Sequence, residues 1–233
     1  MPTVDNGRME LSDVMRTMGA VREFTDEPVE DRMIFEILDN ARFAPSGGNR
    51  QGWRAILVQD PQLRLGLRDL YLPGWDEYLA MGRAGLVPWA PLTDREAEAK
   101  ALRDAPASAA KRGAFAERLH EVPVLIVLLA DLRALAAVDR DLDRYTLVGG
   151  ASIYPFAWNI LLAARERGLG GVMTTMLTRQ EAQVRALLAV PEEYAVAAAL
   201  ALGHPARRPT KLRRASVEEF TTVDRFDGAG FTG

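Results

Sequence analysis

The chain has 233 residues, of which 48% are hydrophobic and 26% are charged, and its formal net charge at pH 7 is −3. A chain of this length forms one large domain or two small ones, and it buries enough surface to fold without disulfide bonds. The 29 basic residues nearly balance the 32 acidic ones, which argues against nucleic acid as a partner. Because cysteine is absent, a disulfide framework, a thiol nucleophile, a zinc–thiolate site and an iron–sulfur cluster are excluded.

The sequence contains no segment that is typical of a secretory signal or a membrane span. Residues 1–14 carry acidic groups and no apolar stretch. The longest weakly polar run, residues 149–164, is interrupted by Pro155 and Asn159 and is shorter than the ~20 residues that a membrane-spanning helix needs. We therefore expect a cytoplasmic protein with no membrane partner.

The first third of the chain predicts two helices with a strand between them. Residues 30–43 place their apolar side chains on one helical face, and Pro45 with the glycines after it ends the helix. Residues 55–58 form a short apolar run that predicts a strand, and residues 61–71 predict the second helix. The apolar face of the first helix consists of Met33, Ile34, Ile37, Leu38 and Ala41.

The second half of the chain predicts strands that alternate with helices. Residues 122–130 are apolar and rich in β-branched side chains, so we expect a central strand that is buried on both faces. Residues 145–167 predict a buried helix that ends at Gly168. The remaining predicted elements are a strand over 172–176, a helix opened by the capping pattern Thr178-x-x-Glu181, and a strand over 196–202.

Residues 72–121 differ in character from the rest of the chain. They contain Pro-Gly and Pro-Trp-Ala-Pro turns and a charged helix that the pattern Thr93-x-x-Glu96 opens. We interpret them as an insertion, or lid, that covers another part of a single domain spanning residues 1–233. From about residue 204 to the end the chain is polar and Arg-rich, which predicts a C-terminal arm.

Three aromatic residues in the insertion have two possible roles. Trp75, Tyr78 and Trp89 could form an aromatic lid over a flat ligand. Equally, they could anchor the insertion to the body of the protein. The sequence does not decide between these roles.

The segment Ala44-Pro-Ser-Gly-Gly-Asn-Arg-Gln51 is the most informative loop of the sequence. Its glycines let the backbone approach a phosphate or a polyhydroxyl group closely, and its backbone N–H groups can donate to such a group. Asn49 and Gln51 can each donate and accept, which suits the edge of a heterocycle. The alternative is an ordinary loop that terminates a helix.

The segment Lys211-Leu-Arg-Arg214 in the C-terminal arm is basic. It could bind an anionic group such as a phosphate. Alternatively, it is a solvated basic patch in front of a helix that the pattern Ser216-x-x-Glu219 caps.

Several familiar sites are excluded by spacing. Gly168-Leu-Gly-Gly171 is not a dinucleotide-binding fingerprint, because Met173 stands where the third glycine would be and the order is helix then strand. His120 and His204 form neither a metal-binding pattern nor part of a serine triad. We therefore predict no catalytic side chain and no metal ligand, but we expect the strand that contains Met173 to line a ligand.

Three segments, in this order, resemble the nitroreductase family of FMN-dependent flavoproteins. They are Val21–Val29 with the helix and loop that follow up to Gln51, the buried helix that runs into Gly-Leu-Gly-Gly, and the strand that ends in Gly203-His-Pro205 before the basic segment. The resemblance covers most of the chain outside 72–121. It implies an α+β fold, a three-layer α/β/α sandwich around a mostly antiparallel sheet, in an intertwined homodimer.

The resemblance also implies where FMN binds. Arg22 is expected beside the flavin, and the loop before Gln51 is expected to contact the FMN of the other subunit. The end of the strand over 172–176 is expected to face the N5 edge of the flavin through its backbone, and two basic residues of the arm are expected on the phosphate. With Gln51 and Met173, which their chemistry and position single out, the expected cofactor-binding residues are Arg22, Pro45, Ser46, Gly47, Asn49, Gln51, Met173, Thr174, Thr175, Lys211 and Arg213.

One stretch departs from the family pattern. The family usually has Arg-Arg-Ser just before the Val-Arg pair, where this chain has Met18-Gly19-Ala20. An arginine and a hydroxyl that normally help to bind the phosphate are therefore absent. Because a charged hydrogen bond is worth about 1.5–3 kcal/mol, we expect weaker FMN binding or a larger role for the basic arm.

The function that the resemblance implies is an FMN-dependent oxidoreductase. NAD(P)H gives a hydride to flavin N5, and a nitroaromatic, a quinone or a similar small electron-poor molecule then takes it in a ping-pong reaction. No side-chain acid or nucleophile is required, because the cofactor carries the chemistry. The alternatives are a flavoenzyme of the same fold that performs reductive dehalogenation or flavin fragmentation, a flavin-binding protein without turnover, and a purely structural domain.

Overall fold

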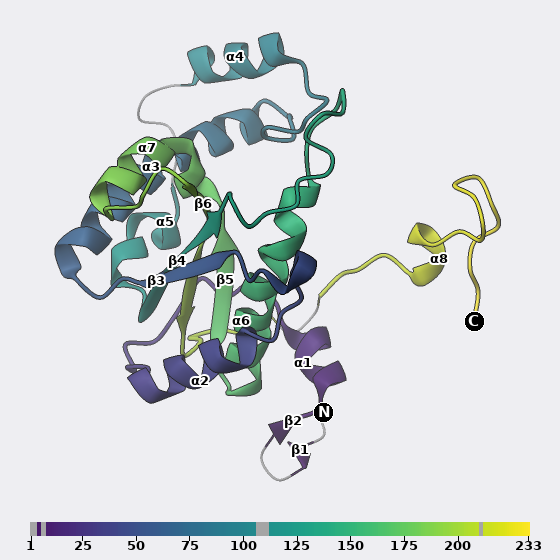
Figure 1. Cartoon of the computed structure of the whole chain (residues 1–233). Helices are drawn as coiled ribbons and strands as arrows, with labels where there is room; N and C mark the ends of the chain where they lie inside the picture. The colour runs from purple at the N-terminus through teal and green to yellow at the C-terminus, as the bar shows by residue number, and fades with distance from the viewer. Residues whose placement is uncertain (1–3, 6–7, 106–111, 210–211) are drawn as a thin grey trace.

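A computed structural model describes residues 4–5, 8–105, 112–209 and 212–233. At its centre lies a four-stranded sheet in the order β3-β4-β6-β5, in which every neighbouring pair is antiparallel (Figure 1). A short hairpin of β1 (Val4–Asp5) and β2 (Arg8–Met9) lies near the N-terminus. The strands of the central sheet are β3 (Trp53–Leu57), β4 (Val124–Asp131), β5 (Gly170–Thr174) and β6 (Tyr194–Gly203).

Strand β4 is buried on both faces, as its sequence predicts. Its side chains from Val124 to Ala130 are at most 6% exposed. Ile126 and Leu128 belong to the hydrophobic core on one face of the sheet, whereas Leu125 and Val127 belong to the core on the other face. A strand between two cores needs apolar side chains at every position, which explains the unbroken apolar run.

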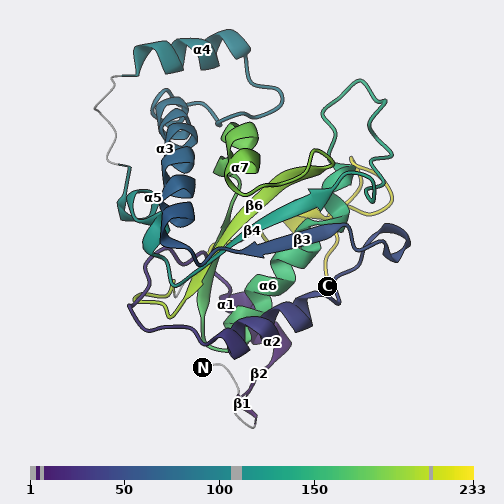
Figure 2. The same cartoon turned by 60° about the vertical axis from the view of Figure 1, so that its left-hand side comes forward.

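Helices cover both faces of the sheet and give the molecule three layers (Figure 2). One layer contains α2 (Asp31–Ala41) and α6 (Tyr154–Glu166), with α1 (Leu11–Thr17) packed against α6. The opposite layer contains α3 (Pro61–Arg83), α5 (Ala114–Glu117) and α7 (Glu181–Leu187). Helix α4 (Arg95–Asp104) packs on α3. The predicted three-layer sandwich around an antiparallel sheet is confirmed.

The predicted helix over 61–71 is too short, because α3 continues to Arg83 through Pro73. A proline inside a helix removes one backbone donor, and packing can compensate for that loss. Here the ring of Trp75 stacks on Tyr71 with their centroids 6.0 Å apart, which holds the helix together across the proline. The predicted start of the insertion at residue 72 therefore falls inside α3.

The buried helix begins later than predicted. Helix α6 starts at Tyr154 rather than at residue 145, because Pro155 lies in its first turn, where the missing N–H has no partner to lose. A 3₁₀ turn, η3 (Val148–Ser152), precedes it. The carboxylate of Asp139 accepts hydrogen bonds from backbone N–H groups at the start of this turn, so these donors are satisfied outside the helix.

The capping pattern Thr178-x-x-Glu181 is a wrong prediction. The Thr178 hydroxyl donates to the carbonyl oxygen of Thr175 at 2.8 Å, within the 3₁₀ turn η4 (Met176–Gln180). The carboxylate of Glu181 accepts from the backbone N–H of Val196 at 2.6 Å, at the start of β6. Glu181 therefore joins α7 to the sheet instead of closing a capping box.

The other two capping patterns have different outcomes. Thr93 does not cap α4, because Asp94 takes that position and its carboxylate accepts from the backbone N–H of Glu96 at 2.9 Å. The capping box of Ser216 and Glu219 is confirmed, and it opens the short helix α8 (Val217–Phe220). The remaining predicted strands and α2 are confirmed, with ends shifted by one or two residues.

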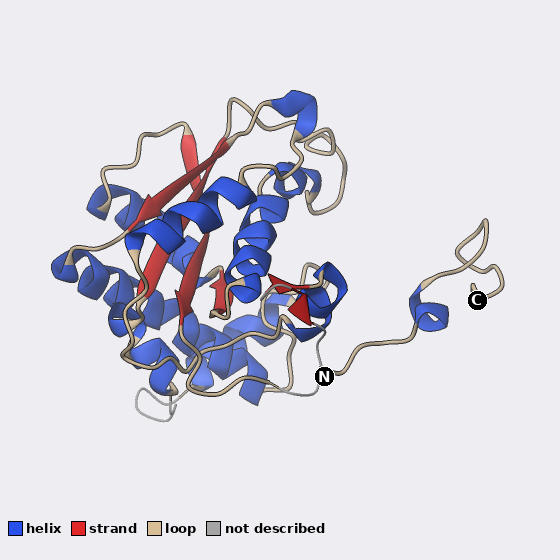
Figure 3. Cartoon of the chain, turned by 90° about the horizontal axis from the view of Figure 1, so that it is seen from below, coloured by secondary structure: helices blue, strands red, loops and turns tan. Residues whose placement is uncertain are grey.

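The outer part of the C-terminal arm, residues 212–233, extends away from the body of the molecule (Figure 3). It carries large apolar side chains that are exposed, among them Phe220 (69%) and Phe226 (101%). None of the helices within the described ranges has the length and apolar character to cross a membrane. The expected homodimer and the cytoplasmic location stay predictions.

Candidate functional site

The segment around Arg22 links the edge strand β5 to the start of the C-terminal arm. The backbone N–H of Val21 donates to the carbonyl oxygen of Gly171 in β5 at 3.0 Å. Farther along the segment, the carbonyl oxygen of Glu23 accepts from the backbone N–H of Ala206 at 3.0 Å. Arg22 is therefore fixed between the sheet edge and the arm, with an exposed side chain.

The charge of Arg22 acts on the hydroxyl of Tyr71, which in turn contacts the hydroxyl of Thr174. Tyr71 is only 1% exposed, and its hydroxyl lies 3.3 Å from the Thr174 hydroxyl. Burial raises the pKa of Tyr71 above its usual value, while the hydrogen bond with Thr174 and the charge of Arg22 act in the opposite direction. The phenol therefore stays neutral at physiological pH and can donate. Two of the expected cofactor-binding residues, Arg22 and Thr174, are brought together in this way.

The three expected residues at the end of β5 do not face the same way. Met173 packs against the core that α2 and α6 cover, whereas Thr174 meets Tyr71 in the opposite layer. Side chains alternate between the faces of a strand, so Met173 and Thr174 cannot present their side chains to one ligand surface. The carbonyl oxygen of Thr175 accepts from both the hydroxyl and the backbone N–H of Thr178, which fixes the backbone at the strand end.

The expected FMN-contacting loop is held in shape by its own polar groups. The Ser46 hydroxyl accepts from the backbone N–H of Gln51 at 2.9 Å, and the Gln51 amide donates to Asn49 at 3.2 Å. The backbone N–H of Gly47 donates to the hydroxyl of Ser152 at 3.0 Å, so the loop is fastened to η3. Pro45, at the start of the loop, is exposed.

The same loop contains backbone that side chains rarely adopt. The φ angles of Gly48, Asn49 and Gln51 are +60°, +53° and +51°. Glycine and asparagine tolerate this left-handed region, but glutamine does so at an energetic cost. Residues in sparsely populated conformations gather at functional sites, and here the conformation holds two exposed amides on one short turn.

The expected site residues fall into two groups at opposite edges of the sheet. The loop that ends at Gln51 leads into β3, while Arg22 and Thr174 lie at β5. Three inter-strand spacings separate β3 from β5, which is about 14 Å. In the described part of the chain, no hydrogen bond or ion pair joins the loop to Arg22 or Thr174. One subunit therefore does not bring the two groups together.

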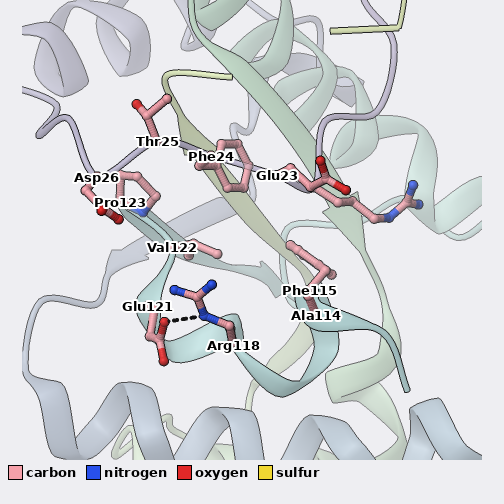
Figure 4. A pocket seen from close by; sticks show the side chains of 11 residues that line it. Glu23, Phe24, Thr25, Asp26, Ala114, Phe115, Arg118, Glu121, Val122 and Pro123 are labelled. Atoms are coloured by element: carbon pink, nitrogen blue, oxygen red, sulfur yellow. Dashed lines mark hydrogen bonds and ion pairs between the residues drawn. The ribbon is translucent and has the colours of Figure 1, made fainter. Parts of the chain in front are cut away.

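Two pockets adjoin Arg22. The smaller one, of about 130 Å³, lies between the segment from Arg22 to Asp26 and the segment from Ala114 to Pro123 (Figure 4). The rings of Phe24 and Phe115 and the side chain of Val122 form its apolar wall. Arg118 and Glu121 are joined by a hydrogen-bonded ion pair of 2.5 Å along its other side.

The larger pocket, of about 330 Å³, lies between residues 20–23 and the start of the C-terminal arm. Its lining includes the side chains of Arg22 and Arg207, together with Glu23 and Pro209. Neither guanidinium forms an ion pair within the residues that the structure describes. The pocket is therefore bordered by two uncompensated positive charges and one carboxylate.

The expected phosphate-binding pair is described only in part. Lys211 lies outside the described residues. Arg213 is exposed, and no described side chain accepts a hydrogen bond from its guanidinium. Among the described residues, no group of three or more His, Cys, Asp or Glu side chains is placed to hold a metal ion.

The aromatic residues of the predicted insertion lie in a row of neighbouring rings. Trp75 and Tyr78 stack with their ring centroids 5.1 Å apart, and Trp89 follows at 6.3 Å from Tyr78. The indole N–H of Trp75 donates to the carbonyl oxygen of Arg112 at 2.6 Å. These contacts tie α3 to the segments on either side of α4, which favours the anchoring role over the lid.

Three polar residues that the sequence did not single out belong to these surroundings. Tyr71 lies in a helical pattern where any large apolar residue fits, so nothing local marks its hydroxyl as useful. Ser152 meets Gly47 across 105 positions of sequence. Arg207 lies four residues before the basic segment that begins at Lys211, but nothing in the sequence indicates that it lines a pocket together with Arg22.

Comparison with known proteins gives a family match and full-length relatives. The model of the nitroreductase family matches residues 18–204. An NADH dehydrogenase of Thermus thermophilus is 29% identical over 199 residues, which cover 85% of this chain and 88% of that protein. A nitrobenzene nitroreductase of Ectopseudomonas oleovorans is 26% identical over 230 residues, which cover 91% of this chain and 96% of that protein.

Solved structures share the fold. The crystal structure of an oxidized iodotyrosine deiodinase bound to FMN and 3-iodo-L-tyrosine matches with a TM-score of 0.66 and 23% identity. The match covers 93% of this chain and 100% of the other. The predicted nitroreductase-like fold is confirmed.

Proposed function

The chain belongs to the nitroreductase family, and on this premise we propose that it is a cytoplasmic, FMN-dependent oxidoreductase that works as a homodimer. It moves two electrons and a proton, as a hydride, from NAD(P)H to small electron-poor aromatic molecules such as nitroaromatics and quinones. The observation that carries the proposal is the uncompensated charge of Arg22, held beside the Thr174 and Tyr71 hydroxyls at the edge of the sheet.

The residues around Arg22 fit a phosphorylated, ring-shaped cofactor. The pocket of about 330 Å³ has two guanidinium groups without acidic partners, and such groups bind phosphate in a bidentate manner. Arg22, Thr174 and Thr175 would hold the ring end, and the arm would hold the phosphate. Met173 contributes through the backbone of β5, since its side chain packs into the core.

FMN, when bound, supplies the hydride chemistry. The positive charge of Arg22 would stabilise negative charge that develops in the pocket. Tyr71 orients the Thr174 hydroxyl at the end of β5. A side-chain acid or nucleophile is not needed for this reaction, and none is assigned.

The homodimer is part of the proposal because each subunit lacks one side of the site. The loop with Ser46, Gly47, Asn49 and Gln51 lies at the sheet edge opposite to Arg22. In the dimer, the loop of one subunit completes the pocket of the other. The exposed apolar side chains of α1, α2 and the C-terminal arm support a large interface; they include Leu11, Met15, Phe35, Phe43, Phe220 and Phe226.

A panel of electron acceptors tests the proposed function. The FMN-loaded protein is assayed under steady-state conditions with NADH or NADPH as donor and with a nitroaromatic, a quinone, a halophenol or oxygen as acceptor. We expect turnover with the nitroaromatic and the quinone, and parallel double-reciprocal lines that indicate a ping-pong reaction. Turnover with the halophenol alone would instead support reductive dehalogenation, and no turnover with any acceptor would support a binding protein.

A further inference from the structure

Four arginines lie in or next to the segment that runs from Thr17 to Arg22. Arg165, at the end of α6, is 8% exposed, and its Nε donates to the Thr17 hydroxyl at 3.0 Å. Arg208 donates to the backbone carbonyl oxygens of Gly168 and Leu169, just after α6, at 2.7 and 3.2 Å. Arg22 and Arg207 line the larger pocket. Within the described residues none of the four forms an ion pair.

Two arginines of this cluster, Arg165 and Arg208, are close enough for the charge of one to act on the other. Burial lowers the pKa of Arg208, and the positive charge of Arg165 lowers it further. Among the described residues, Glu23 is the one carboxylate that lines the larger pocket, and it forms no ion pair with Arg22 or Arg207. A pocket with this balance of charge attracts anions.

Of Arg165, Arg207 and Arg208, only Arg207 has a guanidinium with no described hydrogen-bond acceptor. The guanidinium of Arg208 already donates to backbone carbonyls, and that of Arg165 already donates to Thr17. Arg207 is exposed, lines the pocket, and donates to no described acceptor. Its five N–H donors are therefore free for a ligand.

Packing fixes the arm where Arg207 can reach the pocket. A Cβ atom at the buried Gly19 would lie 2.9 Å from Cδ2 of Leu212 and 3.1 Å from Cγ of Pro209. At these separations a side chain at position 19 would require the side chain of Leu212 or the ring of Pro209 to shift. The two residues that flank Gly19 are apolar: Met18 is buried, at 5% exposed, and Ala20 carries only a methyl group. Residues 18–20 therefore offer the pocket no polar side chain.

We propose that Arg207 binds the phosphate group of FMN in the pocket that it shares with Arg22, and so replaces the cation and hydroxyl that residues 18–20 lack. This assignment rests on the proposed function, since it names a ligand of the same cofactor. The ligand chemistry is a phosphomonoester dianion, whose oxygens match the planar fork of a guanidinium. Arg165 and Arg208 raise the positive potential around it without touching it.

The test compares FMN with riboflavin, which lacks the phosphate. Both are titrated against the protein by fluorescence quenching, with wild type, Arg207→Gln and Arg207→Lys. Arg140→Gln is the matched control, because Arg140 is a surface residue whose side chain is 77% exposed and, among the described residues, pairs with Asp141 alone. Circular dichroism confirms that each variant is folded.

We expect Arg207→Gln to weaken FMN binding about 10- to 100-fold and to leave riboflavin binding unchanged. Arg207→Lys retains the charge but not the fork, so it recovers part of the FMN affinity. Added salt weakens FMN binding more in wild type than in Arg207→Gln. Arg140→Gln behaves as wild type.

Two results would overturn the assignment of Arg207, and only one of them would also overturn the proposed function. If Arg207→Gln keeps the wild-type ratio of FMN to riboflavin affinity, Arg207 is not a phosphate ligand, while the proposed function stands. If wild-type protein binds neither flavin, the assignment and the proposed function fail together.

Discussion

Arg22 combines three properties that are seldom found together in a surface arginine. Its backbone is fixed between β5 and the arm, its guanidinium has no acidic partner among the described residues, and it adjoins two pockets. An arginine without an acidic partner forgoes a stabilising ion pair, and such arginines are common at sites that bind anions. The family resemblance placed Arg22 at the cofactor, but it did not indicate that Tyr71 and Arg207 would be its neighbours.

Replacement of Arg22 by Met removes the charge and keeps most of the side-chain volume. We expect reduction of the bound flavin by NADPH to slow about 10- to 100-fold, because one charged interaction is lost from the reduced state. The rate is measured by anaerobic stopped-flow absorbance, with Arg140→Met as the control. An unchanged rate in Arg22→Met would remove this role from Arg22.

Asp131, at the end of β4, gives a prediction about acid stability. The hydrogen bonds and the charge of Arg133 lower the pKa of Asp131 from 3.8 to about 2. The folded protein therefore binds this proton less tightly than the unfolded chain does. The stabilisation is complete above about pH 4 and is lost as the pH falls through about 2.

The measurement is the urea midpoint as a function of pH for wild type and Asp131→Asn. We expect the variant to be less stable at neutral pH and the difference between the two proteins to shrink as the pH falls from 4 to 2. A difference that stays constant over this range would show that ionisation of Asp131 does not contribute.

At the scale of elements, the sequence predicts best where one requirement dominates. β4 lies between two cores and needs apolar side chains throughout, so its existence and burial follow directly from the run of apolar residues. The ends of helices are harder to predict, because polar groups that are adjacent in sequence or distant from it compete to bind the backbone N–H groups there. Asp94 displaces Thr93 as a cap, Glu181 bonds to β6 instead of its own helix, and aromatic packing carries α3 past Pro73.

The glycines after α6 show why the candidate site was only partly predictable. Gly168 has a φ of +80° and ends the helix, as expected. Gly170 and Gly171 are instead required by close packing, since a Cβ atom on Gly170 would lie 2.7 Å from Val21 and one on Gly171 would lie 2.6 Å from Leu202. The contacts that position the segment before Arg22 come from residues distant in sequence, so no local pattern reveals them.

Replacement of Gly171 by Ala tests this packing. The added methyl group meets Leu202 at 2.6 Å and Leu161 at 2.9 Å, so we expect a loss of about 1–3 kcal/mol in the free energy of unfolding. Gly82→Ala in α3 is the control, because nothing lies within 4 Å of its added Cβ, and it should stabilise by up to about 1 kcal/mol. The two are compared by urea unfolding, and equal stabilities would contradict the packing argument.

At the scale of the whole molecule, the two halves of the expected site lie on opposite edges of one sheet. The proposed second subunit would bring these two halves together. It would also cover the large apolar side chains that α1, α2 and the arm expose.

Mixing two defective variants tests the shared site. Arg22→Met disables the pocket, and Asn49→Asp disables the loop while it keeps a residue that tolerates a positive φ. After joint refolding, half of the dimers are mixed and each has one intact site, so activity should recover to about a quarter of the wild-type value. If the mixed dimer forms, as shown by two affinity tags, yet recovers no activity, the loop acts within its own subunit.

The visible absorption spectrum under nitrogen shows whether the protein binds FMN and accepts electrons onto it from a reduced nicotinamide. The purified protein is incubated with FMN, separated from free flavin by gel filtration, and then titrated with NADPH or NADH. We expect the protein to retain the yellow flavin band, and we expect the band to bleach when the reduced nicotinamide is added. A protein that emerges colourless, or one whose flavin band persists with both donors, would contradict the proposed function.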